Sequence, residues 1–195
     1  MKKKNLKPLT LNPFMLLIGF SIIVCTESMG QSYSNASTVW EVGKEQTDYG
    51  TVILRVEGSN DNSGVTNIAY ESPDKMKADV KARAAKLMWT DEKLKEEIGN
   101  VDKFVPGGMI NLYVTRGTIP AANSGNFTLI IQDKTGKEIF RKQFSKEPPL
   151  GKDGENYYST NIMTLNKKID PPFFVFVIDN YSEKKFKFEV KGQAK

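Results

Sequence analysis

The C-terminal stretch of this chain alternates strictly between apolar and charged residues. Phe186, Phe188 and Val190 occupy every second position, and the charged residues lie beside and between them: Lys185, Lys187, Glu189 and Lys191. Successive side chains of a β-strand point to opposite faces, whereas a helix would scatter these residues around its axis. The pattern therefore predicts a strand over residues 184–191, an outer strand with one face on a core and one in solvent.

Further short apolar runs are separated by turn-forming residues. They lie at 51–56, 65–70, 109–114, 127–132, 137–144, 157–165 and 173–179. Asp133 and Gly136 take the first and fourth positions of an expected type I hairpin turn. Many short strands joined by polar turns predict a mainly β fold, an antiparallel β-sandwich of the immunoglobulin-like or a similar kind, as one domain over residues 38–195.

Two of these runs raise the question of which side chains are buried. In the first, Val52, Leu54 and Val56 alternate with Thr51, Ile53 and Arg55, which predicts one well-buried face. The run 173–178 is apolar throughout and follows two prolines, so it requires cover on both faces. We expect a central strand with the second sheet on one face and a helical segment on the other. Alternatively, Phe174 and Phe176 line a groove for an apolar ligand or a partner protein.

Residues 73–98 break the β pattern and predict an inserted segment of one or two helices. Ser72 and Pro73 are suited to open the first helix, as the cap and the first-turn residue. Thr90 can cap a second helix, which Gly99 is expected to stop. The apolar positions of the first helix fall on one side, at Met76, Val80, Ala84 and Leu87.

Residues 1–30 have the order of charge, apolar run and small residues that is typical of a secretory signal peptide. Four lysines precede an apolar run over 14–25, and small residues at 28–30 precede Gln31. The apolar run is shorter than the roughly 20 residues that span a membrane. We therefore expect cleavage after Gly30, release of the chain into the periplasm or medium, and a flexible lead-in over 31–37.

Cys25 supports an alternative to release. It ends the apolar run, where a lipoprotein signal also places the cysteine that carries its lipid. Val24 is bulkier than the small residue that usually precedes such a cysteine. A lipidated Cys25 would tether the protein to the envelope, so that membrane contact would come only through the signal or the lipid. The style of the signal and the lysine-rich composition indicate a bacterial source.

The composition excludes several kinds of chemistry. The chain has no histidine, and Cys25 is its only cysteine. A Ser-His-Asp triad, a Cys-His dyad, a histidine-bound zinc and a disulfide within the chain are therefore excluded. Without residues 1–30, 24 basic residues stand against 22 acidic ones. This balance does not favour nucleic acid as a partner.

Two weaker patterns point to ligands. Aromatic residues could form a platform for sugar rings, foremost Tyr157 and Tyr158, with Trp40, Tyr49 and Tyr181. The segment Asn60, Asp61 and Asn62, followed by Ser63 and Gly64, resembles part of a calcium loop, but it has a single carboxylate. Apart from that calcium we expect no cofactor, and no metal ligand is otherwise indicated.

The sequence as a whole favours an exported, non-catalytic β-sandwich module of the bacterial cell envelope or its exterior. A sheet face or the end loops would bind a protein, glycan or lipid. The alternatives are a membrane-anchored lipoprotein with a structural or accessory role, and a small hydrolase that uses paired carboxylates. No carboxylate pair with separated pKa values stands out, because the acids of residues 91–97 alternate with lysines.

Overall fold

Ten strands and two α-helices make up the part of the chain that the computed structural model describes, residues 40–58 and 64–193. The elements follow one another as β1 (Glu45–Asp48), β2 (Thr51–Glu57), β3 (Thr66–Glu71), α3 (Pro73–Lys86), α4 (Asp91–Phe104), β4 (Met109–Arg116), the 3₁₀ turn η1 (Ser124–Asn126), β5 (Phe127–Asp133), β6 (Glu138–Gln143), β7 (Gly151–Asp153), β8 (Asn156–Thr164), β9 (Phe173–Asp179) and β10 (Lys184–Gln193). The short strands β1 and β7 were not predicted. The signal peptide, the lead-in and Cys25 lie outside the described residues.

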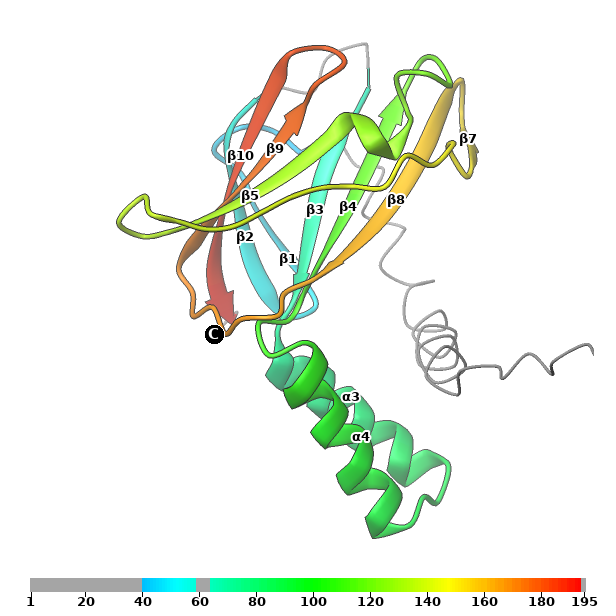
Figure 1. Cartoon of the computed structure of the whole chain (residues 1–195), viewed down its shortest axis with the longest axis vertical. Helices are drawn as coiled ribbons and strands as arrows, with labels where there is room; N and C mark the ends of the chain where they lie inside the picture. The colour runs from blue at the N-terminus through cyan, green and yellow to red at the C-terminus, as the bar shows by residue number, and fades with distance from the viewer. Residues whose placement is uncertain (1–39, 59–63, 194–195) are drawn as a thin grey trace, which may run out of the picture. The chain divides into compact units, whose positions relative to one another are not determined.

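The strands form two antiparallel sheets that face each other (Figure 1). One has six strands in the order β1-β2-β10-β9-β5-β6, and the other has four in the order β3-β4-β8-β7. The predicted mainly β fold, a β-sandwich with a helical insertion, is confirmed. The alternation in β10 is also confirmed, but β10 lies between β2 and β9, inside its sheet. Its charged face is therefore the outer surface of a central strand, because neighbours pair with both of its edges.

The inner faces of the two sheets enclose one large apolar core. Side chains of every second residue interlock there, as expected for packed antiparallel sheets. The core comprises Trp40, Ile53, Ile68, Tyr70, Ile110, Leu112, Val114, Phe127, Leu129, Ile131, Phe144, Met163, Leu165, Phe173, Val175, Val177, Phe186, Phe188 and Val190. None of these residues belongs to a helix. The sandwich therefore holds its core without help from the helical insertion.

The buried face of β2 carries a charge. Thr51, Ile53 and Arg55 point inward, with Arg55 fully buried, while Val52 and its alternating partners are only half-buried on the outer face. The Arg55 guanidinium donates hydrogen bonds to the carbonyls of Trp40 (2.9 Å) and Gly58 (2.6 Å). It also lies over the rings of Phe186 and Phe188. The more apolar set faces outward because these contacts satisfy the arginine inside.

The expectation that the helices cover the outer face of 173–178 is wrong. Phe173, Val175 and Val177 enter the core, whereas Phe174 and Phe176 lie on the outer face of the six-stranded sheet. Lysine side chains of β10 cover these two rings instead. The Lys187 ammonium is 4.5 Å from the centroid of Phe174, and that of Lys185 is 5.0 Å from Phe176. The long alkyl stem of a lysine commonly covers an aromatic ring in this way while its charged head stays in water.

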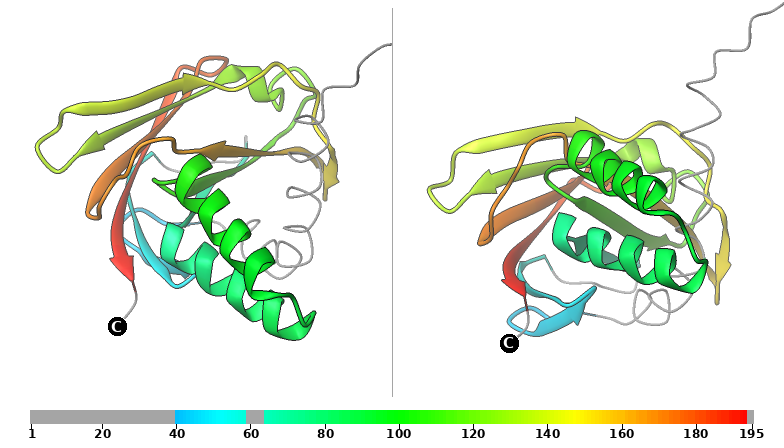
Figure 2. Two further views of the ribbon diagram at one scale, coloured as in Figure 1. Left: turned by 60° about the horizontal axis from the view of Figure 1, so that its bottom comes forward. Right: turned by 90° about the horizontal axis from the view of Figure 1, so that it is seen from below.

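The two helices form a hairpin that leaves one end of the sandwich between β3 and β4 (Figure 2). Ser72 and Thr90 cap the helices as predicted, since their hydroxyls accept from the N–H groups of Lys75 and Lys93. Gly99 does not stop α4, which continues to Phe104. The extra turn is held by a small second core, which comprises Val101, Val105 and Met109 with Met76 and Val80 packed against them.

The turn between β5 and β6 is the one that the sequence predicts. Asp133 Oδ1 accepts hydrogen bonds from the N–H groups of Thr135 (2.8 Å) and Lys137 (3.1 Å). Gly136 has a φ of +86°, a conformation that glycine adopts without strain. Among the described residues, neither helix combines the length and the apolar character that a membrane span requires.

Candidate functional site on the helical hairpin

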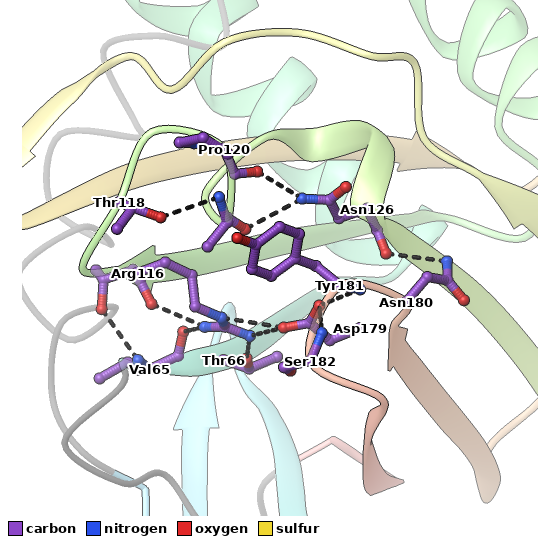
Figure 3. Close-up of polar contacts among 12 residues, drawn as sticks. Val65, Thr66, Arg116, Thr118, Pro120, Asn126, Asp179, Asn180, Tyr181 and Ser182 are labelled. Carbon is purple, nitrogen blue, oxygen red and sulfur yellow. Dashed lines mark hydrogen bonds and ion pairs between the residues drawn. The ribbon is translucent and has the colours of Figure 1, made fainter.

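A buried ion pair joins the two sheets at the end of the sandwich opposite to the hairpin (Figure 3). Arg116 from β4 donates to Asp179 Oδ2 from β9 through Nη2 (2.8 Å) and Nε (3.1 Å). Its remaining N–H groups bind Thr66 Oγ1 and the carbonyls of Val65 and Thr115, each at 2.8 Å. All five donors of the guanidinium are thus used inside the protein. This cluster, the Arg116 node, is built to hold the sheets together.

The loops around this node are also held by hydrogen bonds. Asp179 Oδ1 accepts from the N–H groups of Tyr181 (3.0 Å) and Ser182 (3.2 Å). Asn126 Nδ2 donates to the carbonyl of Pro120 (2.7 Å), and Asn180 Nδ2 donates to the carbonyl of Asn126 (2.9 Å). Figure 3 shows the ring of Tyr181 beside this loop. The polar groups of these end loops therefore serve mainly to fix one another.

Three charged side chains meet where α3 joins the sandwich. Glu71 is the last residue of β3, and its carboxyl group is hydrogen-bonded to the carboxyl group of Asp79, two turns into α3. Lys75 Nζ lies 2.5 Å from both oxygens of Asp79. The carboxyl group of Glu71 therefore lies against a second carboxyl group that already forms an ion pair with a lysine. Burial first, and then the Asp79 carboxylate, raise the pKa of Glu71 to about 7.

This junction, Glu71 with Asp79 and Lys75, is a carboxylate pair that the sequence did not reveal. Its members lie on two different elements, so no local pattern announces them. Two carboxyl groups in a direct hydrogen bond are closer than the roughly 5 Å that separates the pair of a retaining glycosidase. Lys75 is also bound to Asp79. The arrangement therefore suits a structural contact between the hairpin and the sheet better than an acid–base pair.

The proton on Glu71 should make the stability of the protein depend on pH. Its pKa of about 7 in the folded state lies well above the value of an unfolded chain, roughly 4.3. Between these values the folded protein holds a proton that the unfolded chain has lost, so stability falls as the pH rises through this window. We expect the free energy of unfolding to drop by roughly 2 kcal/mol between about pH 5 and pH 8.

Urea unfolding at both pH values measures this effect. Glu71→Gln keeps a hydrogen-bonding side chain but cannot ionise, so it should remove the drop and raise stability at the higher pH. Glu96→Gln, on the exposed side of α4, is the matched control and should keep the wild-type profile. The chain has no histidine, so few other groups titrate in this window. An unchanged pH profile in Glu71→Gln would contradict the assignment.

The far end of the hairpin exposes apolar side chains. Leu87 is 55 % exposed and Met88 91 % exposed, and Trp89 beside them is half-buried. These three residues, the apolar tip, connect the end of α3 to Thr90, the cap of α4. Connections between helices are usually polar, because apolar side chains at such a place remain in water. Met88 is the most exposed of the large apolar side chains among the described residues, which makes the apolar tip a candidate contact surface.

The geometry of the apolar tip adds a second peculiarity. The N–H of Leu87 donates to the carbonyl of Arg83 (2.9 Å) and that of Trp89 to the carbonyl of Ala84 (3.0 Å). Met88 has a φ of +51°. Helices often end with one residue in this left-handed conformation, but that residue is usually glycine. A methionine there strains the backbone by about 1 kcal/mol.

The predicted aromatic residues are dispersed. Tyr157 and Tyr158 are neighbours on β8 and point to opposite faces of the four-stranded sheet, where Tyr158 stacks on Tyr113 with centroids 6.2 Å apart. Trp40 is buried against Phe188 in the core. The structure thus does not bring these aromatic residues together as a single platform. Phe174 and Phe176 do share a face, under the lysines of β10.

The predicted calcium loop lies outside the described residues, since Asn60, Asp61 and Asn62 fall in the gap between 58 and 64. In the described part of the chain, no group of three or more acidic, histidine or cysteine side chains is placed to hold a metal ion.

A signal for the apolar tip was present in the sequence. Leu87, Met88 and Trp89 stand directly before a helix cap, at a place where a polar turn is expected. The helical spacing predicted Leu87 on the apolar side of the first helix, but it gave no reason to single out Met88 and Trp89. The Glu71–Asp79 junction, in contrast, required the three-dimensional structure.

Comparison of the sequence with models of known protein families gives no match, and no curated protein matches it either. Fold and surface therefore define the protein by its architecture, as a β-sandwich with a helical hairpin inserted between two paired strands.

Proposed function

We propose that this protein is an exported, non-catalytic binding module of the bacterial cell envelope or its exterior, and that it contacts its partner through the apolar tip of the hairpin. The signal-like order of residues 1–30 supports export. The absence of histidine, together with the use of all donors of the Arg116 node within the fold, supports a binding role over a catalytic one.

The observation that carries the proposal is the exposure of Leu87 and Met88 at the end of two paired helices. Large apolar side chains at the end of a rigid support contribute to binding when a partner removes them from water. The helices contribute no residue to the core of the sandwich, so packing of that core does not explain the exposed apolar side chains at their far end. Trp and Met are also residue types that are enriched at interfaces.

The hairpin is held in a fixed form. Lys77 of α3 and Asp102 of α4 form an ion pair between the helices, and the small core of Val101 and Val105 lies at their base. Helices of 14 residues place the tip about 20 Å from the sandwich. A partner would therefore meet the tip before it meets the sheets.

A lipid anchor at Cys25 remains the alternative for location. In that case the protein is an envelope lipoprotein with an accessory role, and the hairpin reaches its partner from a tethered position. The intact mass of the processed protein distinguishes release from lipid anchoring, because a chain that starts at Cys25 carries acyl groups and one that starts at Gln31 does not.

Removal of the hairpin tests the proposal. Because Glu71 and Met109 are paired neighbours in the sheet, residues 72–108 can be replaced by Asn-Gly, a two-residue turn that suits antiparallel strands. We expect this variant to fold with a loss of about 1–2 kcal/mol, chiefly from lost hydrogen bonds of Gly107 and Gly108. Both proteins should be processed at Gln31 in a bacterial host, but only the intact one should stay with washed envelopes.

Three outcomes would contradict the proposal. An unprocessed chain in the cytoplasm would exclude export. Equal retention of the intact protein and the shortened variant would exclude the hairpin as the contact surface. A mass that includes acyl groups, with both proteins bound to the envelope, would favour the lipoprotein alternative.

A further inference from the structure

We infer that the apolar tip inserts into the surface of a lipid bilayer, with Leu87, Met88 and Trp89 at the level between headgroups and acyl chains. This inference rests on the proposed function and names the partner of the same site. Three features of this one turn support it: the exposure of its apolar side chains, the left-handed backbone of Met88, and the charged side chains on either side.

Met88 is the central residue of the tip. It is 91 % exposed and has a left-handed backbone, the last-turn position that glycine usually occupies. Glycine or asparagine there would relieve the strain and would be well solvated. A methionine at this position gains nothing for the fold, but it gains a large apolar contact when an apolar medium surrounds it.

Two N–H groups of the tip are already hydrogen-bonded within the protein. The N–H groups of Leu87 and Trp89 are bonded to carbonyls of α3, and the hydroxyl of Thr90 accepts from the N–H of Lys93. A polar backbone group that enters hydrocarbon unpaired is costly, so the bonds of Leu87 and Trp89 lower the cost of insertion relative to an open loop. These bonds also fix the backbone from which the three side chains project.

The flanking side chains match an interfacial depth. The Lys93 ammonium lies 4.6 Å from the centroid of the Trp89 ring, and Lys86 is exposed in the last turn of α3. Tryptophan with lysine beside it is typical of the boundary between headgroups and acyl chains. Asp91 and Glu92 stand in the first turn of α4. Arg83 also lies in the last turn of α3, so three basic and two acidic side chains flank the tip. The net charge is small, so we expect insertion driven mainly by apolar contact, with little dependence on anionic lipid or on salt.

The two tryptophans of the chain allow a direct test. Trp40 is 3 % exposed in the core, so only Trp89 can change its surroundings upon insertion. The processed protein from its bacterial host is mixed with vesicles of phosphatidylcholine and phosphatidylethanolamine, and tryptophan emission and co-sedimentation are recorded. We expect a blue shift and binding, and we expect Trp89→Phe to abolish the shift.

Met88→Asp is the decisive variant. It should weaken vesicle binding about tenfold or more, the effect of removing one large apolar side chain. The melting temperature should stay the same or rise by about 2–4 °C, because aspartate tolerates the left-handed conformation. Leu150→Asp is the matched control, since Leu150 is 65 % exposed outside the hairpin, and its vesicle binding should be unchanged.

Several results would overturn the inference. These are no binding to vesicles, binding only to phosphatidylglycerol vesicles that high salt abolishes, or equal losses in Met88→Asp and Leu150→Asp. If the hairpin is required for envelope retention and protein-free vesicles are not bound, the proposed function stands and the partner is a protein or glycan. If retention does not depend on the hairpin, the proposed function fails whatever the vesicles show.

Discussion

Replacement of Arg116 by methionine should be among the most damaging single changes in this protein. Asp179 is 1 % exposed, and this substitution would leave its buried carboxyl group without the guanidinium that pairs with it. Removal of one partner of a buried ion pair typically costs about 3–5 kcal/mol. That is a large part of the roughly 5–15 kcal/mol by which domains are stable. Urea unfolding of Arg116→Met, compared with the wild type, measures it.

Two controls show whether the loss of stability comes from the unpaired buried carboxyl group or simply from replacing an arginine. Arg141→Met removes an exposed ion pair with Glu138, which water and salt screen, so its effect on stability should be far smaller than that of Arg116→Met. The double variant Arg116→Met with Asp179→Asn should recover part of the loss. Asparagine leaves no buried charge, and its oxygen can still accept from Tyr181 and Ser182. A double variant no more stable than Arg116→Met would show that the buried charge is not the cause.

Gly107→Ala should also lower the stability of the protein strongly. A methyl group on Gly107 would lie 2.0 Å from the carbonyl oxygen of Lys167 and 2.8 Å from Cβ of Leu165. The N–H of Gly107 is bonded to the carbonyl of Leu165 at 2.9 Å, so the backbone cannot move away freely. We expect a loss of about 2–3 kcal/mol, comparable to overpacking a core.

Gly99→Ala is the matched control for this glycine. Gly99 lies within α4, and a methyl group there would meet no atom within 4 Å. Alanine favours the helix over glycine by up to about 1 kcal/mol, so this variant should be more stable than the wild type. If urea unfolding shows that Gly107→Ala is less stable and Gly99→Ala more stable than the wild type, the loss at Gly107 comes from its close packing and not from replacing a glycine as such. Losses of equal size would contradict this.

Much of the fold could be predicted because strands are local patterns. The alternation around Phe186 and Phe188 correctly identified the inner face of β10. The pattern of β2 did not reveal its inner face, because the burial of Arg55 depends on carbonyls and rings from distant parts of the chain. The predicted placement of the helices failed for a similar reason. Sequence spacing indicates that a hairpin exists, but not which end of the sandwich it leaves.

In the candidate site, too, one part could be predicted from the sequence and another could not. The apolar tip lies within three consecutive residues, so the turn before Thr90 carries its signal in the sequence itself. The junction of Glu71 and Asp79 arises only when α3 folds back against the end of β3. The pKa of Glu71 is thus a property of the tertiary structure, and no sequence pattern carries it.

The insertion of the hairpin between β3 and β4 has a consequence for the order of folding. These strands pair in register from Glu71 opposite Met109, yet residues 72–108 separate them along the chain. Closing a long flexible loop costs conformational entropy, which must be lost before the contacts between the strands can form. Helices form in about a microsecond. Once α3 and α4 pair, the start of α3 and the end of α4 lie close together, and so do the strand ends that they continue. The hairpin thus turns a distant pairing into a nearly local one, and the four-stranded sheet can begin to form at its base.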